Sequence, residues 1–383
     1  MQPTLEKDFT PAAQWLAVSL ELAVGSWKIG LHDGQRERAL VRSVDGERAA
    51  QRLAEAMQVM EDTRHKWGLA PGCRVVVVYE AGQDGFWIKR ALEQQGYEVL
   101  VVDPASIPVE RRARRAKTDR LDAIKLVLSL LGWLRGERDR MQVIRMPERA
   151  AEARRHWARD RGQLQKEIGQ HRDRIRKLLR TVGCWQRVGE DFAQQLEQGA
   201  VRCYDGSSLA PELRARLARE WARLALVQQQ LAELEQALRE QLPAELRARI
   251  EQLRGLKAIG EVGATRLMLE LFWRGFSNRR QVGACVGLVP QPYDSGQSRI
   301  DQGISKQGNR RVRALAIEMA WMWLRYQPQS ALAQWFSRRT QGSGGSKRSR
   351  RVAIVAVARR LMIDLWRYLQ DGVLPEGAQM KSH

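Results

Sequence analysis

One apolar run limits the possible folds of this chain more than any other feature. The segment CRVVVVYEAG (73–82) places four valines in a row. A strand that is apolar on both faces lies in the middle of a sheet covered on both sides. The run therefore predicts a central β-strand in an α/β domain.

The segments around this run alternate between strand and helix patterns. Three short strands separated by turn residues come first, which is typical of an antiparallel meander. Helices with one apolar face then alternate with further strands. We expect strands at 14–24, 26–34, 38–46, 73–82 and 97–104, and helices at 47–69, 85–95 and from 119 onward. The order β-β-β-α-β-α-β-α predicts an α/β domain over residues 1–148.

Residues 149–254 carry a different pattern. Apolar residues recur at alternating spacings of four and three in 150–182 and again in 209–254, as in a coiled-coil seam. The link between them, 183–208, is long enough to turn an antiparallel hairpin. The seam can pair within one chain or between two, and it fits a spacer, a dimerisation arm or an arm that grips RNA.

Residues 255–383 predict a mostly α-helical domain. The segment LKAIGEVGATRLMLEL (256–271) resembles a helix-hairpin-helix with its turn at 259–263, where backbone N–H groups meet a phosphate; an ordinary packing turn is the alternative. The segment 276–324 combines a short apolar helix, a polar loop rich in Gly, Ser and Gln, and a basic helix. A flexible basic joint at 342–351 precedes a last helix at 352–370, whose apolar stripe is expected in the core.

The net charge of +21 points to a polyanionic partner. Such an excess favours nucleic acid, with a membrane surface as the weaker alternative. No apolar run is long enough to span a bilayer, the first residues lack a signal-peptide pattern, and a reducing cytoplasm fits the four scattered cysteines. Neither the cysteines nor the histidines show zinc-ligand spacing, so a metal would be a hard cation held by carboxylates.

Four carboxylates are candidates for such a site. Glu21 lies on the first strand, Glu80 ends the valine run, and Asp119 and Asp122 lie one helical turn apart. In this element order they converge at one edge of the sheet, where two Mg²⁺ ions would clamp a phosphodiester. Each acid alone has a plainer explanation: a solvent-facing strand edge, a loop, or the acidic first turn of a helix.

These motifs resemble a known family. VVVVYEAG, YEVLVVDP and RRAKTDRLDAIKL resemble the RuvC-like, RNase H-fold domain of the DEDD-type insertion-sequence transposases, the bridge-RNA-guided recombinases. IGEVGATRLMLEL, QVGACVGLVPQPYDSGQS and GISKQGNRRVR resemble their C-terminal transposase domain. The resemblance covers nearly the whole chain in the same order, coiled coil included.

The resemblance implies specific roles. The four metal-binding acids would be Glu21, Glu80, Asp119 and Asp122, holding Mg²⁺ or Mn²⁺, and the nucleophile would be Ser295, which would form a phosphoserine link to DNA. The family begins its acid set with Asp, so Glu21 is a departure; a shifted alignment would place Ser19 there instead. Ser295 in a Ser-Gly turn is otherwise an ordinary polar loop residue.

Two basic groups are expected to hold nucleic-acid phosphates, and the second of them could equally be a solvated helix face. Lysine and arginine contacts to phosphate supply affinity rather than sequence specificity. The two groups are Arg111, Arg112, Arg114, Arg115 and Lys117, and Lys306, Arg310, Arg311 and Arg313. No base-reading motif is present, which fits the family's implied partners: double-stranded donor and target DNA, a structured guide RNA, and further copies of the chain in a dimer or tetramer.

Three functions remain open from the sequence. The first is a transposase that cuts and rejoins DNA through Ser295 with RNA guidance, acting at the nucleoid in a prokaryotic cytoplasm without a membrane partner. The second is a RuvC-like junction nuclease that uses the acids alone. The third is a non-catalytic nucleic-acid-binding scaffold.

Overall fold

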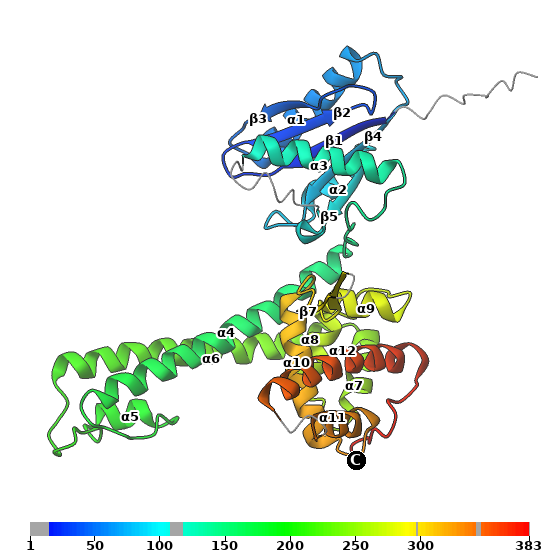
Figure 1. The fold of residues 1–383 in the computed structure, drawn as a ribbon. Helices are drawn as coiled ribbons and strands as arrows, with labels where there is room; N and C mark the ends of the chain where they lie inside the picture. The colour runs from blue at the N-terminus through cyan, green and yellow to red at the C-terminus, as the bar shows by residue number, and fades with distance from the viewer. Residues whose placement is uncertain (1–14, 108–117, 296–297, 342–345, 383) are drawn as a thin grey trace, which may run out of the picture. The chain divides into compact units, whose positions relative to one another are not determined.

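The computed structural model describes residues 15–107, 118–295, 298–341 and 346–382, with only the backbone described at 105, 293–295 and 298–301. The chain divides into two compact units, Met1–Met146 and Pro147–His383. The first unit contains a five-stranded sheet in the order β3-β2-β1-β4-β5 (Figure 1). Its elements are β1 (Trp15–Glu21), β2 (Trp27–His32), β3 (Leu40–Val44), α1 (Ala49–Lys66), β4 (Arg74–Glu80), α2 (Trp87–Gln94), β5 (Glu98–Val102) and α3 (Asp119–Leu134).

The valine run forms the centre of this sheet. β4 is parallel to both β1 and β5, while β1, β2 and β3 form the expected antiparallel meander. Val75 and Val77 belong to the core cluster shared with α1 and α2, whereas Val76 and Val78 belong to the cluster shared with α3. The prediction of a central strand buried on both faces is confirmed.

The second unit begins with two long helices joined through a short one. These are α4 (Arg149–Arg180), α5 (Phe192–Glu197) and α6 (Pro211–Gln241). Ion pairs join Arg161 to Glu235 and Arg174 to Glu220. Later residues of α4 therefore contact earlier residues of α6, so the two helices are antiparallel (Figure 1). The seam therefore pairs within one chain; a regular coiled coil remains a prediction.

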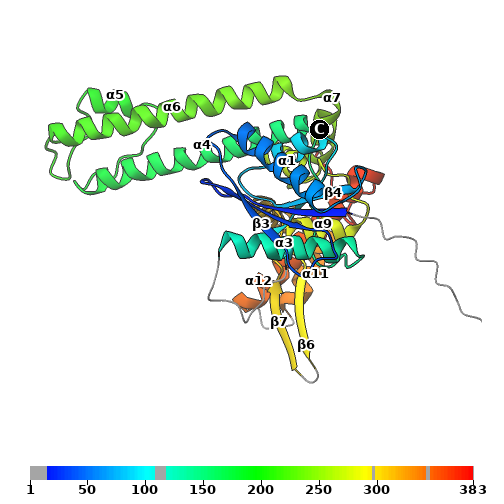
Figure 2. The same ribbon diagram turned by 90° about the horizontal axis from the view of Figure 1, so that it is seen from above.

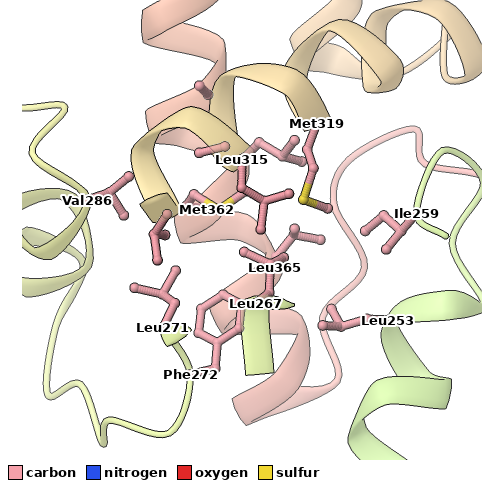
Figure 3. Close-up of a cluster of buried hydrophobic side chains, with 14 of the residues drawn as sticks. Leu253, Ile259, Leu267, Leu271, Phe272, Val286, Leu315, Met319, Met362 and Leu365 are labelled. Atoms are coloured by element: carbon pink, nitrogen blue, oxygen red, sulfur yellow. The ribbon is translucent and has the colours of Figure 1, made fainter. Parts of the chain in front are cut away.

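The other helices of this unit surround a second large core. They are α7 (Ala244–Arg254), α8 (Glu261–Glu270), α9 (Arg279–Val286), α10 (Arg310–Tyr326), α11 (Ala331–Gln341) and α12 (Lys347–Asp371). Figure 3 shows Leu267 of α8 and Leu365 of α12 among the side chains that meet in this core. Each such side chain contributes about 1.5–3 kcal/mol when fully buried. The apolar stripe of the last helix lies in the core as predicted.

The structure corrects three local predictions. The segment predicted as a polar loop forms an antiparallel hairpin of β6 (Pro290–Ser295) and β7 (Ser298–Ile304), seen side by side in Figure 2. The turn predicted at 259–263 lies earlier, because Gly263 is inside α8 and the left-handed residue is Ala258. The basic joint is partly helical, because Ser346 caps α12 by accepting a hydrogen bond from Ser349 N.

In the described part of the chain, no helix combines the length and the apolar character needed to cross a membrane.

Candidate active site

Two of the four predicted acids end neighbouring parallel strands. In the pairing of β1 with β4, Leu20 lies opposite Tyr79, and Glu21 and Glu80 follow these residues at the ends of their strands. Ligand sites of open α/β sheets lie at the carboxyl ends of the strands. The sheet therefore brings Glu21 and Glu80 to one edge.

Both acids also share one face of the sheet. Ser19 lies opposite Val78, and both are on the face that α3 covers, since the Ser19 hydroxyl donates a hydrogen bond to the carbonyl of Ala123 at 2.6 Å. Side chains two residues apart on a strand point to the same face. Glu21 and Glu80 thus face the layer that contains α3, and both are half-buried.

Helix α3 runs in the opposite direction to β1. Its second turn contacts Ser19 through Ala123, and the Arg135 guanidinium after its last turn donates to the carbonyl of Gly34, which lies beside Trp15. The N-terminus of α3 is therefore directed toward the end of β1 that carries Glu21.

The two aspartates lie in the first turn of α3. Thr118 caps the helix by accepting a hydrogen bond from Leu121 N, so Asp119 and Asp122 occupy the first and fourth helical positions. Asp119 is exposed, while Oδ1 of Asp122 lies 3.6 Å from Nζ of Lys125. The plainer explanation, an acidic first turn that favours the helix dipole, also holds for this geometry.

The four acids share one region but do not form a closed ligand cluster. Among the residues that the structure describes, no group of three or more His, Cys, Asp or Glu side chains lies close enough to hold a metal ion. Their carboxylate oxygens are nevertheless the donors that Mg²⁺ and Mn²⁺ prefer. The donor chemistry fits a hard cation, and gathered carboxylates need one to offset their repulsion.

Ser19, which a shifted alignment would put in the place of Glu21, lies inside the domain. It is fully buried, and its hydroxyl is committed to Ala123. The backbone of Gly30 passes directly over this contact, because a Cβ at Gly30 would collide with the Ser19 hydroxyl. Ser19 therefore joins the sheet to α3, while Glu21 lies at the open strand end.

In the second unit, Ser295 is the last residue of β6 and pairs with Ser298 at the start of β7. Residues 296–297, which connect them, lie outside the described residues. The hairpin places Ser295 next to its tip, at the far end from the helices that hold β6 and β7.

A tight turn connects this hairpin to α10. In this turn, Lys306 and Gly308 have left-handed backbones with φ of 54° and 85°. Gly287, which ends α9 just before β6 and packs against the turn, has φ of 68°. A Cβ at Gly287 would collide with the carbonyl of Gln307, and one at Gly308 with the carbonyl of Cys285. Only glycine permits both the conformation and the close approach at these two positions.

The basic residues after this turn differ in their surroundings. Arg310 and Arg311 are exposed in the first turn of α10, where positive charge opposes the helix dipole. The Arg313 guanidinium instead donates a hydrogen bond to the carbonyl of Lys306 at 2.9 Å, so it supports the turn. The other predicted phosphate contacts, Arg111, Arg112, Arg114, Arg115 and Lys117, lie outside the described residues.

Sequence reasoning missed Asn309, which ties this turn together. Its side-chain oxygen accepts hydrogen bonds from Arg311 N and Val312 N and so caps α10, and its Nδ2 donates to the buried carboxylate of Glu270 at 3.1 Å. An Asn before a basic amphipathic segment is a recognised cap signal. The link to Glu270 has no local signal.

Two family models match the chain. A model described as the transposase IS116/IS110/IS902 family matches residues 250–335, the part that contains Ser295. A DEDD transposase model of the IS110 type matches residues 38–183, the part that contains Glu80, Asp119 and Asp122.

Whole proteins are similar as well. A protein of Sinorhizobium fredii, y4rJ, which is named as a transposase, is 40% identical over 378 residues, with 95% of this chain and 94% of the relative covered. A second Sinorhizobium fredii protein named as a transposase, y4qE, is 29% identical over 66% of this chain and 60% of its own length. The transposase for insertion sequence element IS1328 of Yersinia enterocolitica is 32% identical over 28% of this chain and 32% of its own length.

Proposed function

Because the chain belongs to the IS116/IS110/IS902 family of transposases, enzymes that act on DNA, we propose that it cuts and rejoins DNA through a covalent phosphoserine bond at Ser295. The observation that most supports metal-dependent chemistry on DNA is the sheet edge where β1 and β4 end at Glu21 and Glu80, toward which the first turn of α3 directs Asp119 and Asp122. The order of strands and helices in this unit fits an RNase H-like domain.

The acids are proposed to hold Mg²⁺ or Mn²⁺. A bound divalent cation supplies electrostatic stabilisation to the phosphate under attack. Glu21 and Glu80 would hold it from the sheet, and Asp119 and Asp122 from the start of α3. The longer side chain of Glu21, compared with the aspartate expected there, reaches one methylene further from its strand.

Ser295 is proposed as the nucleophile. Its Oγ forms an ester bond to phosphorus, the bond from phosphorus to one sugar oxygen breaks, and that oxygen leaves as a hydroxyl after taking up a proton. Attack by a hydroxyl of a new strand reverses the step and returns the serine. Because the ester keeps the bond energy, no ATP is required for rejoining. A serine hydroxyl needs activation, which a general base or a bound cation can provide.

A structured guide RNA and a dimer or tetramer complete the proposal. The net charge of +21 suits a second polyanion besides DNA. The exposed arginines at the start of α10 would contact backbone phosphates, which carry no sequence information. A guide RNA would then select the DNA sites.

The decisive experiment traps the covalent intermediate. The full chain, with the RNA that co-purifies with it, is incubated with Mg²⁺ and labelled DNA carrying the ends of an insertion sequence, and adducts are separated under denaturing conditions. We expect a protein–DNA adduct that disappears in Ser295→Ala. Ser298→Ala, directly across the hairpin, is the matched control and should keep the adduct.

Two other outcomes would reject the proposal. DNA cleavage that survives Ser295→Ala would identify a junction nuclease that uses the acids alone. No adduct and no cleavage by the wild type, with DNA binding unchanged in both Glu80→Gln and Ser295→Ala, would identify a binding scaffold. Sequencing the co-purified RNA tests the guided step separately, because a discrete structured RNA is expected rather than random fragments.

A further inference from the structure

A cluster of arginines surrounds one buried carboxylate in the second unit. Glu270, at the end of α8, is 4% exposed. Its carboxylate lies 3.5 Å from Arg155 Nε and 3.3 Å from Arg159 Nε, both on α4. Arg274, in the segment after α8, donates a hydrogen bond to Cys285 Sγ at 3.0 Å. Three helices and a connecting segment thus bring their polar groups to one place.

Positive charge exceeds negative charge within this cluster. Burial lowers the pKa of Arg155, and the neighbouring guanidiniums of Arg159 and Arg274 lower it further, while Glu270 opposes them. Arg155 and Arg159 therefore share one carboxylate, and Arg274 adds a third positive charge close to Arg155. Burying surplus charge is costly unless a counter-charge is nearby, so this imbalance favours the arrival of an anion.

The cluster also keeps donors unused. Among the described residues, Arg155 Nε and Arg274 Nε are buried and lack a hydrogen-bond partner, although Arg155 Nε is ion-paired with Glu270 at 3.5 Å. Both guanidiniums lie over the ring of Trp273, with their central carbons 5.6 Å and 4.9 Å from its centroid. The ring fixes the position of the two cations without neutralising them. Arg159, with 36% of its side chain exposed, connects the cluster to solvent.

The same carboxylate holds the turn that leads from the serine hairpin. Asn309 donates to Glu270, and its backbone N–H donates to the carbonyl of Cys285. Cys285 therefore accepts one hydrogen bond from Arg274 on its sulfur and another from the backbone N–H of Asn309 on its carbonyl. The arginine cluster and the base of the β6–β7 hairpin are parts of one hydrogen-bonded network.

We propose that Arg155, Arg159 and Arg274, positioned by Glu270, form an anion site that binds one backbone phosphate of a nucleic acid beside the turn from the serine hairpin. The proposal rests on the proposed function in taking nucleic acid as the ligand. Guanidiniums bind phosphate through paired donors in a fixed plane, and the turn follows the hairpin that carries Ser295. The bound phosphate would hold the strand in register with the hairpin. Sequence alone does not indicate this site, because Arg155 and Arg159 on α4 lie far along the chain from Glu270 and Arg274.

Salt-dependent binding tests this site. The affinity of the full chain for a labelled DNA duplex, and separately for a labelled single-stranded RNA, is measured over a range of salt concentrations for wild type, Arg159→Gln and Arg274→Gln. Each phosphate contact contributes roughly 0.9 to the slope of log K against log salt for a duplex and about 0.7 for a single strand. We expect each variant to lower the slope by about one contact, for the duplex if the phosphate is from DNA, or for the RNA if it is from RNA.

Arg254→Gln is the matched control. Arg254 is paired with its own carboxylate, Glu251, on the surface of α7, so its loss leaves no vacant phosphate contact and should not change the slope. Thermal melting of each variant checks folding, and the partly exposed Arg159 keeps the test valid if Arg274→Gln unfolds. Unchanged slopes with both probes for the folded variants would overturn the proposal.

Ser295→Ala separates this inference from the proposed reaction. That variant should lose the covalent adduct and keep the wild-type slope. A covalent adduct that survives Ser295→Ala, together with a lowered slope in Arg159→Gln, would reject the proposed chemistry and keep the phosphate site. Loss of the adduct in Ser295→Ala with unchanged slopes in the arginine variants would do the reverse.

Discussion

The two units present their candidate catalytic residues in opposite ways. In the first unit, Glu21 and Glu80 follow directly from buried strands, so the same apolar runs that build the core place the acids. In the second unit, Ser295 ends a polar strand, and the turn behind it is held by glycines and by polar contacts to Asn309 and Glu270. A site on strand ends is as firm as the sheet itself, whereas a site on a hairpin depends on a few specific contacts at its base.

The largest expected effect on DNA cleavage is at the sheet edge that carries Glu21 and Glu80. Glu80→Gln removes a charge from the end of β4 without disturbing its core, and we expect DNA cleavage to fall by about 10²–10³-fold, the usual loss when one electrostatic contribution to phosphate chemistry is removed. Single-turnover cleavage with Mg²⁺ measures this. Glu98→Gln is the control, because Glu98 begins β5 at the opposite edge and pairs with Arg74 on the surface. Equal loss in both variants would mean that the sheet, rather than the edge, is being perturbed.

A second pair of variants decides the position of the first acid. Glu21→Gln should reduce cleavage about as much as Glu80→Gln does. Ser19→Ala should keep cleavage and instead cost about 1 kcal/mol of stability, because it removes a buried hydrogen bond to α3. Cleavage assays and chemical denaturation separate the two effects. Loss of cleavage in Ser19→Ala with unchanged activity in Glu21→Gln would reverse the assignment.

The base of the serine hairpin gives the next effect. Gly287→Ala forces a side chain into a left-handed backbone and against the carbonyl of Gln307. Backbone strain alone costs about 1–2 kcal/mol, so we expect the free energy of unfolding to fall by more than that. Gly303→Ala has a similar φ of 82° but open space around its Cβ position, and it should show only the strain. Chemical denaturation of both variants measures the difference. If the two variants are equally destabilised, the close approach of Gly287 to the carbonyl of Gln307 contributes nothing to stability, and the base of the hairpin is not tightly packed.

The contrast between the units also explains what the sequence could predict. The valine run, the meander and the position of Glu80 were predictable because burial on two faces leaves a continuous apolar signal. The hairpin was predicted as a loop because residues such as Asp294, Gln302 and Gly303 lack the alternation that marks a half-buried strand. The division of the chain at 148 and 254 and the roles of the four acids and Ser295 stay predictions.

Contacts between distant residues account for the other omissions. Glu270 and Asn309 are 39 residues apart, and Ser19 and Ala123 are 104 apart. No local pattern encodes such pairs, because each partner is compatible with its own helix or strand without the other. The seam between α4 and α6 was predictable, but the buried Glu220 within it was not, since a charged residue reads as surface in a helical pattern.

This glutamate provides the smallest predicted effect and a pH test of the helical hairpin. Although burial alone raises the pKa of Glu220, hydrogen bonds from His171 and Arg174 outweigh it, and the net pKa is lowered. A lowered pKa in the folded state means that Glu220 stabilises the hairpin above its unfolded pKa, and that this contribution is lost as pH falls through the folded pKa. Glu220→Gln should therefore cost about 1–3 kcal/mol at neutral pH and progressively less below pH about 4.

Thermal melting of wild type and Glu220→Gln from neutral to acidic pH measures this convergence. Glu233→Gln is the control, because Glu233 is exposed on the same hairpin and accepts a hydrogen bond from Gln229 of its own helix; it should change little at any pH. A difference in melting temperature between wild type and Glu220→Gln that stays constant through the acidic range would show that packing around Glu220, rather than its charge, stabilises the contact of α4 with α6. The α4–α6 hairpin would then be stabilised by apolar packing, as the sheet of the first unit is. Support by specific polar contacts would be a property of the β6–β7 hairpin, which carries Ser295.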